Sequence, residues 1–209
     1  MKKWTIGLTL CFCLSSTSAF AITFNFKDPL FSAAFNQSSF LTTIDGIEIT
    51  ITAIGEEATL WWDEVDGFGI QSTSYENDEI EGDERFELRF STPIIVSSIF
   101  FTDLFNEHGY LETGWYQLGN TDPIAVTADP TQLLVFTNGE LTLTSIPSFV
   151  IDVITFSAPG RIGDQHHEFS VGGIEIQQTP EPGTLVLLGS GMAGLLAWRR
   201  RRQILQVKA

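Results

Sequence analysis

The chain has 209 residues, and its two cysteines, Cys11 and Cys13, lie near the N-terminus. Residues 22–182 contain twenty-six carboxylates and only four basic side chains, a net charge of −22, whereas the other seven lysines and arginines lie near the two ends. This acidic body repels phosphates, so nucleic acid is excluded as a partner. A body of about 160 residues is the size of one domain and can bury a core without disulfides.

Residues 1–21 have the features of a secretory signal peptide. Two lysines precede an uncharged, largely apolar stretch that ends at Leu14. Ala19 and Ala21 then form an Ala-x-Ala site of the kind that signal peptidase cleaves. The apolar stretch is too short to cross a bilayer. We therefore predict that signal peptidase removes this segment after Ala21, which leaves a mature chain without cysteine.

Residues 22–178 consist of segments with the composition of β-strands. Isoleucines alternate with polar residues over 47–52, and residues 86–90 show the same period of two. Residues 94–101 are almost all β-branched or aromatic, which predicts a strand buried on both faces. Asp45-Gly46 and Asn138-Gly139 predict tight turns. Further strands are predicted at 22–26, 59–62, 114–118, 124–127, 133–136, 141–144, 150–156 and 174–176.

The strand pattern predicts an all-β fold, because no segment repeats its apolar residues with the period of a helix. About ten short strands at even spacing favour a two-sheet sandwich of the jelly-roll type. The predicted organisation is a signal peptide (1–21), a sandwich ectodomain (22–178), a linker (179–182), a transmembrane helix (183–198) and a basic cytoplasmic tail (199–209).

The stretch from residue 63 to residue 87 combines ten carboxylates with three glycines. Carboxylates on a glycine-rich loop suit Ca²⁺, which takes six to eight oxygen ligands in flexible geometry. The spacing fits neither an EF-hand nor a calcium-binding nonapeptide repeat, so a solvated acidic loop is the alternative. The candidate Ca²⁺ ligands are Asp63, Glu64, Asp66, Asp78, Glu81 and Asp83.

Two pairs of adjacent aromatic residues lie in predicted strands. Neighbours on a strand point to opposite faces, so one ring of each pair faces outward unless a loop covers it. An exposed ring can stack on a sugar, and it can equally belong to a protein interface. The candidates for ligand stacking are Trp61, Trp62, Trp115 and Tyr116.

Catalytic motifs are absent from the sequence. There is no Gly-x-Ser-x-Gly elbow, no cysteine outside the N-terminal segment and no glycine-rich phosphate loop. The three histidines lack the spacing of zinc ligands. Paired carboxylates for a glycosidase carry no information here, because so acidic a chain always supplies such a pair. We predict that the protein is not an enzyme, with an extracellular hydrolase on a jelly-roll scaffold as the alternative.

The C-terminal region contains three features in order. Pro180, Glu181 and Pro182 precede residues 183–198, which carry no charge, and four arginines follow: Arg199, Arg200, Arg201 and Arg202. Sixteen helical residues rise roughly 24 Å, a little less than the hydrocarbon core of a bilayer. Basic residues stay on the cytoplasmic side. The pattern predicts a membrane helix that stops at the arginines, with the acidic domain outside the cytoplasm.

Residues 180–202 resemble the PEP-CTERM sorting signal of Gram-negative bacteria. Proteins with this signal also carry a cleavable signal peptide. The resemblance implies processing by exosortase, a membrane cysteine protease, and passage from the inner membrane to the cell surface or to exopolysaccharide. Residues 66–70, residues 84–90 and Pro93 look like the middle of other PEP-CTERM ectodomains, whose function is generally unassigned.

The sequence therefore predicts an exported, non-enzymatic surface or extracellular-matrix protein. Its ectodomain is expected to bind a polysaccharide or a protein, with Ca²⁺ as a candidate aid. The hydrolase named above and a purely structural envelope component without a ligand are the alternatives.

Overall fold

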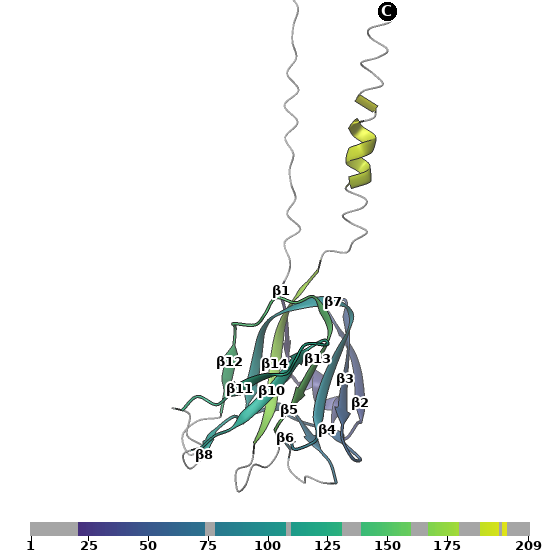
Figure 1. Ribbon diagram of the computed structural model, residues 1–209. Helices are drawn as coiled ribbons and strands as arrows, with labels where there is room; N and C mark the ends of the chain where they lie inside the picture. The colour runs from purple at the N-terminus through teal and green to yellow at the C-terminus, as the bar shows by residue number, and fades with distance from the viewer. Residues whose placement is uncertain are drawn as a thin grey trace, which may run out of the picture. The chain divides into compact units, whose positions relative to one another are not determined.

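The computed structural model describes residues 21–73, 78–107, 110–130, 139–159, 167–179, 189–196 and 198–199. The chain divides into two compact units, one made of residues 20–179 and one made of residues 1–19 with 180–209. The first unit is all-β, as predicted (Figure 1). Residues 1–20 of the predicted signal peptide and the Pro-Glu-Pro motif lie outside the described residues, whereas Ala21, the last residue of the predicted signal peptide, begins β1.

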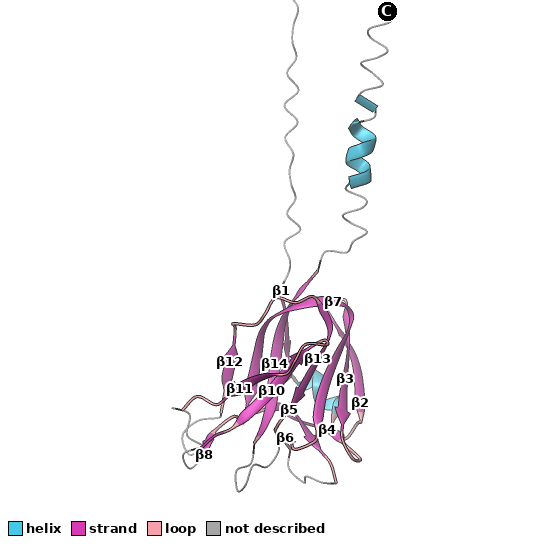
Figure 2. Cartoon of the chain, in the orientation of Figure 1, coloured by secondary structure: helices cyan, strands magenta, loops and turns pink. Residues whose placement is uncertain are grey.

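The described part of the first unit contains strands and a single short 3-10 helix (Figure 2). The elements are β1 (Ala21–Asn25), η1 (Pro29–Ala34), β2 (Ser39–Ile44), β3 (Ile47–Ile54), β4 (Thr59–Asp63), β5 (Gly67–Gln71), β6 (Ile80–Glu81), β7 (Arg85–Thr102), β8 (Asn106–Glu107), β9 (Tyr110–Leu111), β10 (Thr113–Leu118), β11 (Ile124–Thr127), β12 (Leu141–Leu143), β13 (Ile151–Ser157) and β14 (Glu168–Gln178). The predicted strand at 133–136 lies outside the described residues. The strands predicted at 86–90 and 94–101 are one continuous strand, β7.

The β2–β3 hairpin shows how local sequence fixes local structure. Asp45 and Gly46 both adopt positive φ, 50° and 81°, which is the geometry of a two-residue turn that matches the twist of the strands. Ile44 pairs with Ile47 across this turn. Alternation then places Ile47, Ile49 and Ile51 in the core, each with no exposed surface.

Strand β7 organises the sheet, because its two halves have different partners. Residues 85–89 pair with both β3 and β13, and Phe90 pairs with β3. Residues 94–102 pair with β14, and residues 99–101 pair also with β12. The result is a twelve-stranded antiparallel sheet whose main path runs β11-β10-β13-β7-β14-β5-β4, with β8 and β9 forming a separate pair. This strand pairing does not establish the connectivity of a jelly roll, which stays a prediction.

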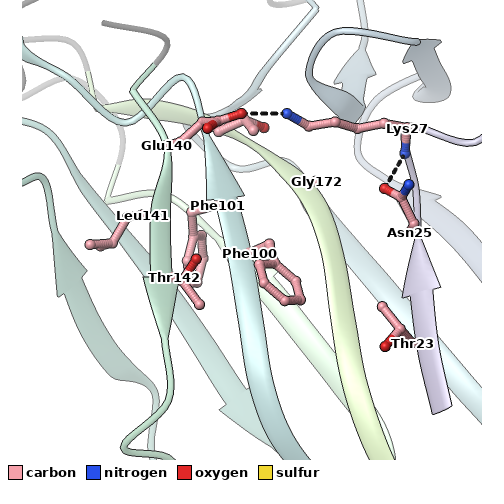
Figure 3. Close-up of a pocket in the computed structure, with 10 residues that line it drawn as sticks. Thr23, Asn25, Lys27, Phe100, Phe101, Glu140, Leu141, Thr142 and Gly172 are labelled. Atoms are coloured by element: carbon pink, nitrogen blue, oxygen red, sulfur yellow. Dashed lines mark hydrogen bonds and ion pairs between the residues drawn. The ribbon is translucent and has the colours of Figure 1, made fainter.

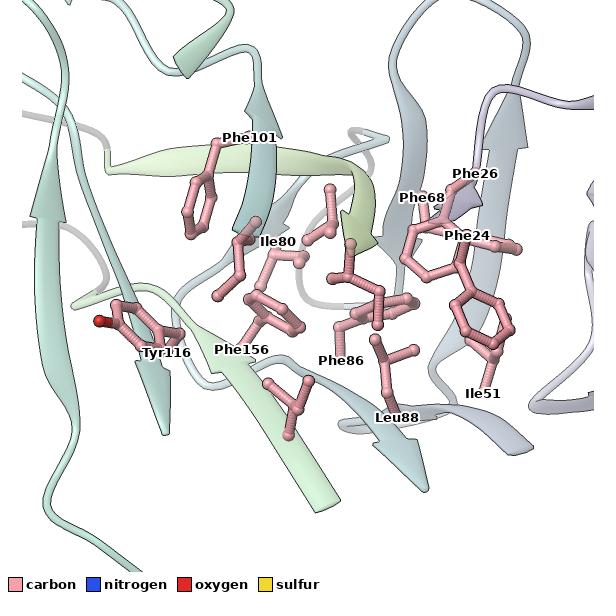
Figure 4. Packing of buried hydrophobic residues seen from close by; sticks show 14 of the residues in the cluster. Phe24, Phe26, Ile51, Phe68, Ile80, Phe86, Leu88, Phe101, Tyr116 and Phe156 are labelled. Carbon is pink, nitrogen blue, oxygen red and sulfur yellow. The ribbon is translucent and has the colours of Figure 1, made fainter. Parts of the chain in front are cut away.

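Phenylalanine rings from both halves of β7 meet in one core (Figure 4). Phe86, in the first half, lies 5.5 Å from Phe68 and 5.8 Å from Phe156 between ring centroids. Phe101, in the second half, lies 6.0 Å from Phe156 and 5.6 Å from Phe169. Burial of each such ring contributes about 1.5–3 kcal/mol. The sheet therefore curves around a single hydrophobic core that belongs to this unit alone.

In the second unit, residues 189–196 and 198–199 are helical. Within the part of the chain that the structure describes, no helix has the length and apolarity needed to cross a membrane. Residues 183–188 and 197 of the predicted span lie outside that part, and the span stays a prediction.

Candidate functional site

A groove of about 340 Å³ lies over the strands β1, β14, β7 and β12 (Figure 3). These four strands are neighbours in the sheet, since β14 pairs with β1 and β7, and β7 pairs with β12. The lining residues are Thr23, Asn25, Lys27, Phe100, Phe101, Thr102, Glu140, Leu141, Thr142 and Gly172.

One row of residues crosses the groove from strand to strand. Asn25 pairs with Gly173, Gly173 with Phe100, and Phe100 with Thr142. Residues that face one another across a sheet point to the same side. Phe100 is partly exposed, whereas its chain neighbours Ile99 and Phe101 are 0% and 1% exposed. The row therefore belongs to the outer face of the sheet and presents one aromatic ring among polar side chains.

Two glycines in β14 keep this face open. A Cβ atom on Gly173 would lie 2.6 Å from the carbonyl oxygen of Phe24 and 3.5 Å from the Phe100 ring. A Cβ atom on Gly172 would lie 3.2 Å from both Lys27 and Thr102. Larger residues would collide with these neighbours and fill the floor of the groove.

An ion pair closes one end of the groove. Lys27 Nζ lies 2.8 Å from Glu140 Oε1, and the side chains are 27% and 58% exposed (Figure 3). Such an exposed pair contributes at most about 1 kcal/mol to stability. Its main effect is positional, because it joins the chain after β1 to the chain before β12 across the sheet.

A second row adds hydrogen-bonding groups beside the first. Thr23 pairs with Glu175, and Glu175 with Ser98. Ser98 Oγ donates to Glu175 Oε2 at 3.0 Å. Ser98 is 3% exposed, and neither residue of this pair lines the groove. The groove itself offers the hydroxyls of Thr23 and Thr142 and the amide of Asn25 around the Phe100 ring, an arrangement suited to a ligand with an apolar face and polar edges.

A separate group of carboxylates has raised pKa values. Burial raises the pKa of Glu79 to about 9, and the charges of Glu168 and Asp103 add to this. Burial likewise raises the pKa of Asp103 to about 7, with Asp66 and Asp78 contributing and a hydrogen bond from Ser170 opposing. The pKa of Asp66 is raised by burial and by Asp63. Near neutral pH this group therefore holds protons that isolated carboxyls would have lost.

The six candidate Ca²⁺ ligands lie in different parts of the structure. Asp63 Oδ1 accepts the N–H groups of Val65 at 2.7 Å and Asp66 at 2.8 Å, so it stabilises the turn between β4 and β5. Asp66 interacts electrostatically with Asp63 and Asp78.

The remaining three candidate ligands lie elsewhere. Glu81 and Asp83 interact instead with Glu84, and Glu64 faces solvent. Among the described residues, no three His, Cys, Asp or Glu side chains come together in a way that could hold a metal ion. The geometry thus gives the calcium prediction no support.

The four candidate stacking residues are also dispersed. Tyr116 is 2% exposed, so its predicted stacking role is wrong and its ring belongs to the core. Trp62 Nε1 donates to the carbonyl of Phe26 at 2.7 Å. Trp61 packs edge-on against Phe35, with 5.0 Å between ring centroids. Trp115 is partly exposed on β10.

The aromatic residue of the groove, Phe100, was not among the predicted site residues. It lies in the run 94–101, which the sequence assigns to a strand buried on both faces, and that assignment is wrong at Ile95, Ser97 and Phe100, which are partly exposed. The signal that would have pointed to it is Gly172-Gly173 in the paired strand. Such a glycine pair often marks a site that must stay open.

The acidic all-β unit is followed by a charge-free segment and four arginines, which is the layout of a β-domain with a C-terminal sorting signal. Residues 178–202 match the model of the PEP-CTERM protein-sorting motif. The chain thus carries the sorting signal that its sequence resembles, and this signal supports an exported, surface-directed protein that exosortase processes. No curated protein matches the chain.

Proposed function

We propose that this protein is a surface or extracellular-matrix protein whose β-domain binds a polysaccharide in the groove over β1, β14, β7 and β12. The observation that carries the proposal is the exposure of Phe100 in an otherwise polar face. A pyranose ring has an apolar C–H face and a hydroxyl rim. Phe100 matches the face, and Asn25, Thr23 and Thr142 supply partners for the rim.

Charge favours an uncharged polysaccharide. Residues 22–182 carry a net charge of −22, which repels anionic polymers at low ionic strength. Lys27, the basic residue that lines the groove, is already paired with Glu140. A neutral glycan therefore has the smaller electrostatic barrier to binding.

The proposal is for binding without catalysis. A glycosidase requires two carboxyls that face one substrate. Glu140 is the carboxylate among the residues that line the groove, and it is held by Lys27. The carboxyls with strongly raised pKa values, Glu79, Glu84 and Asp103, are not lining residues. This arrangement favours a binding module over the alternative hydrolase.

Sorting would deliver this module to its place of action. In the proposal, signal peptidase cleaves after Ala21, the segment 183–198 holds the protein in the inner membrane of a Gram-negative bacterium, and exosortase then processes it. The fold is compatible with this order, because Thr179 Oγ1 donates to the carbonyl of Pro93 at 3.0 Å and the folded domain ends directly before Pro180.

A glycan array tests the binding proposal. The domain, residues 22–179, is applied with and without EDTA, alongside Phe100→Ala and the control Phe149→Ala. Phe149 is 46% exposed and does not line the groove. We expect the domain to be retained on neutral polysaccharides, with or without EDTA. Phe100→Ala should weaken this binding at least tenfold, about 1.4 kcal/mol. Phe149→Ala should bind like the native domain. Retention unaffected by Phe100→Ala, or none on any glycan, would refute binding in the groove.

A further inference from the structure

Strand β2 is an unprotected edge of the sheet (Figure 1). Among the described residues it pairs with β3 alone, and the register is continuous over its six residues. Natural proteins usually protect such an edge with a charge, a proline or a bulge. The sequence Ser-Phe-Leu-Thr-Thr-Ile contains none of these.

The hairpin register fixes which backbone groups face outward. The N–H of Ala53 bonds to the carbonyl of Ser38 at 3.0 Å, so the backbone groups of Ser38 face β3. Along an antiparallel strand this direction alternates from residue to residue. The N–H and C=O groups of Ser39, Leu41 and Thr43 therefore face away from β3. The same three residues also have exposed side chains, and that of Leu41 is 57% exposed.

We propose that β2 pairs in antiparallel fashion with β2 of a second copy of this chain, about a two-fold axis at Leu41. In this register, Leu41 lies opposite Leu41 of the second copy, and Ser39 lies opposite Thr43. The outward groups then form about six backbone hydrogen bonds. The two leucine side chains meet on the same face of the joined sheet and lose their exposure to water. This self-association goes beyond the proposed glycan binding and does not depend on it.

Charge explains why two copies would meet at β2, and the symmetry of a strand edge explains why the partner is a second copy. Residues 22–179 contain 25 carboxylates and four basic side chains, a net charge of −21, so two copies repel each other and can approach closely only where carboxylates are absent. Residues 29–44 contain no charged residue. Asp45, just beyond β2, lies in this register opposite the uncharged residues that precede Ser39. An antiparallel strand edge is also self-complementary about a two-fold axis, as a closed dimer requires.

Cysteine cross-linking tests the register on residues 22–179, which contain the whole core described above and no native cysteine. Leu41→Cys would place two thiols on Cα atoms about 5.5 Å apart, within the range of a disulfide. The matched control, Thr43→Cys, lies two residues away on the same face and opposite Ser39, so its two copies are more than about 10 Å apart. Under copper–phenanthroline and dissolved O₂, Leu41→Cys should give a covalent dimer and Thr43→Cys should not.

Sedimentation measures the association itself. The native domain should double in mass as its concentration rises, and Leu41→Lys should remain a monomer, because a lysine on an edge strand prevents pairing. Ile54→Lys, at a residue that is 39% exposed but lies outside β2, should dimerise like the native domain. A native monomer at every concentration, or equal cross-linking of the two cysteine variants, would overturn the proposal. Circular dichroism verifies that each variant is folded.

Discussion

Asp103 provides a direct test of the electrostatics of the carboxylate group. Burial and the neighbouring acids raise its pKa from the ordinary 3.8 to about 7. The folded protein therefore keeps a proton on Asp103 at pH values where the unfolded chain has lost it. By linkage, this group's contribution to stability falls as the pH rises from about 4 to about 7, and changes little above that.

The replacement Asp103→Asn removes this dependence without changing the shape of the side chain. Asp103 has a φ of 55°, and asparagine tolerates this left-handed conformation as well as aspartate does. Asparagine can also accept the hydrogen bond from Ser170. The substitution therefore isolates the charge from the backbone and from packing.

The pKa values set the size of the effect. A difference of about 3 pH units corresponds to about 4 kcal/mol. Residual solvation and relaxation of Asp66 and Asp78 reduce this, and we expect Asp103→Asn to stabilise the domain by about 2–4 kcal/mol at pH 8. Near pH 4 the native Asp103 is protonated in the folded state and partly protonated in the unfolded chain, so the two proteins should differ by less than about 1 kcal/mol.

Urea unfolding at about pH 4 and about pH 8 measures these free energies, with Asp152→Asn as the control because Asp152 is exposed on β13. The control should change the free energy of unfolding by less than about 0.5 kcal/mol at either pH. A loss of stability for Asp103→Asn at pH 8, or a gain that is the same at both values, would mean that folding does not raise the pKa of Asp103 and would refute the reasoning.

Three further substitutions test other parts of the molecule. Gly69→Ala should lower the free energy of unfolding by about 3 kcal/mol or more in urea titrations, because its Cβ would lie 1.5 Å from the Asp78 carbonyl oxygen. The control Gly55→Ala, whose Cβ would have its nearest contact at 3.2 Å, should lower it by less than about 1 kcal/mol. Trp62→Phe should lose about 1–2 kcal/mol by the same assay, since it leaves the Phe26 carbonyl without its indole donor at 2.7 Å. Glu181→Gln should leave the C-terminal segment attached. The intact mass of the native protein from the cell surface should correspond to a chain that begins at Ile22 and ends near Pro182. Normal processing of the variant would contradict the exosortase assignment.

Features encoded over a few neighbouring residues could be predicted from the sequence. Alternation identified β3 and the first half of β7, because the side-chain period of a strand is local. Asp45-Gly46 identified the hairpin turn for the same reason. The sorting signal is a linear motif with its own order of proline, apolar and basic residues, and the match at residues 178–202 confirms it.

Tertiary structure decided which residues of a strand are covered, and this could not be predicted from local pattern. Tyr116 and Phe100 both lie in strands rich in apolar residues, yet Tyr116 is buried and Phe100 is partly exposed. The difference arises because β14, which lies far from β7 in the sequence, places Gly173 beside Phe100 and leaves that face uncovered. Likewise, Asp66 and Asp103 share one electrostatic environment only because β5 and β7 both meet β14. Strand order is set by the summed packing of distant segments, so the sequence by itself determined the elements and the sorting signal, and the fold determined which residues form the outer surface.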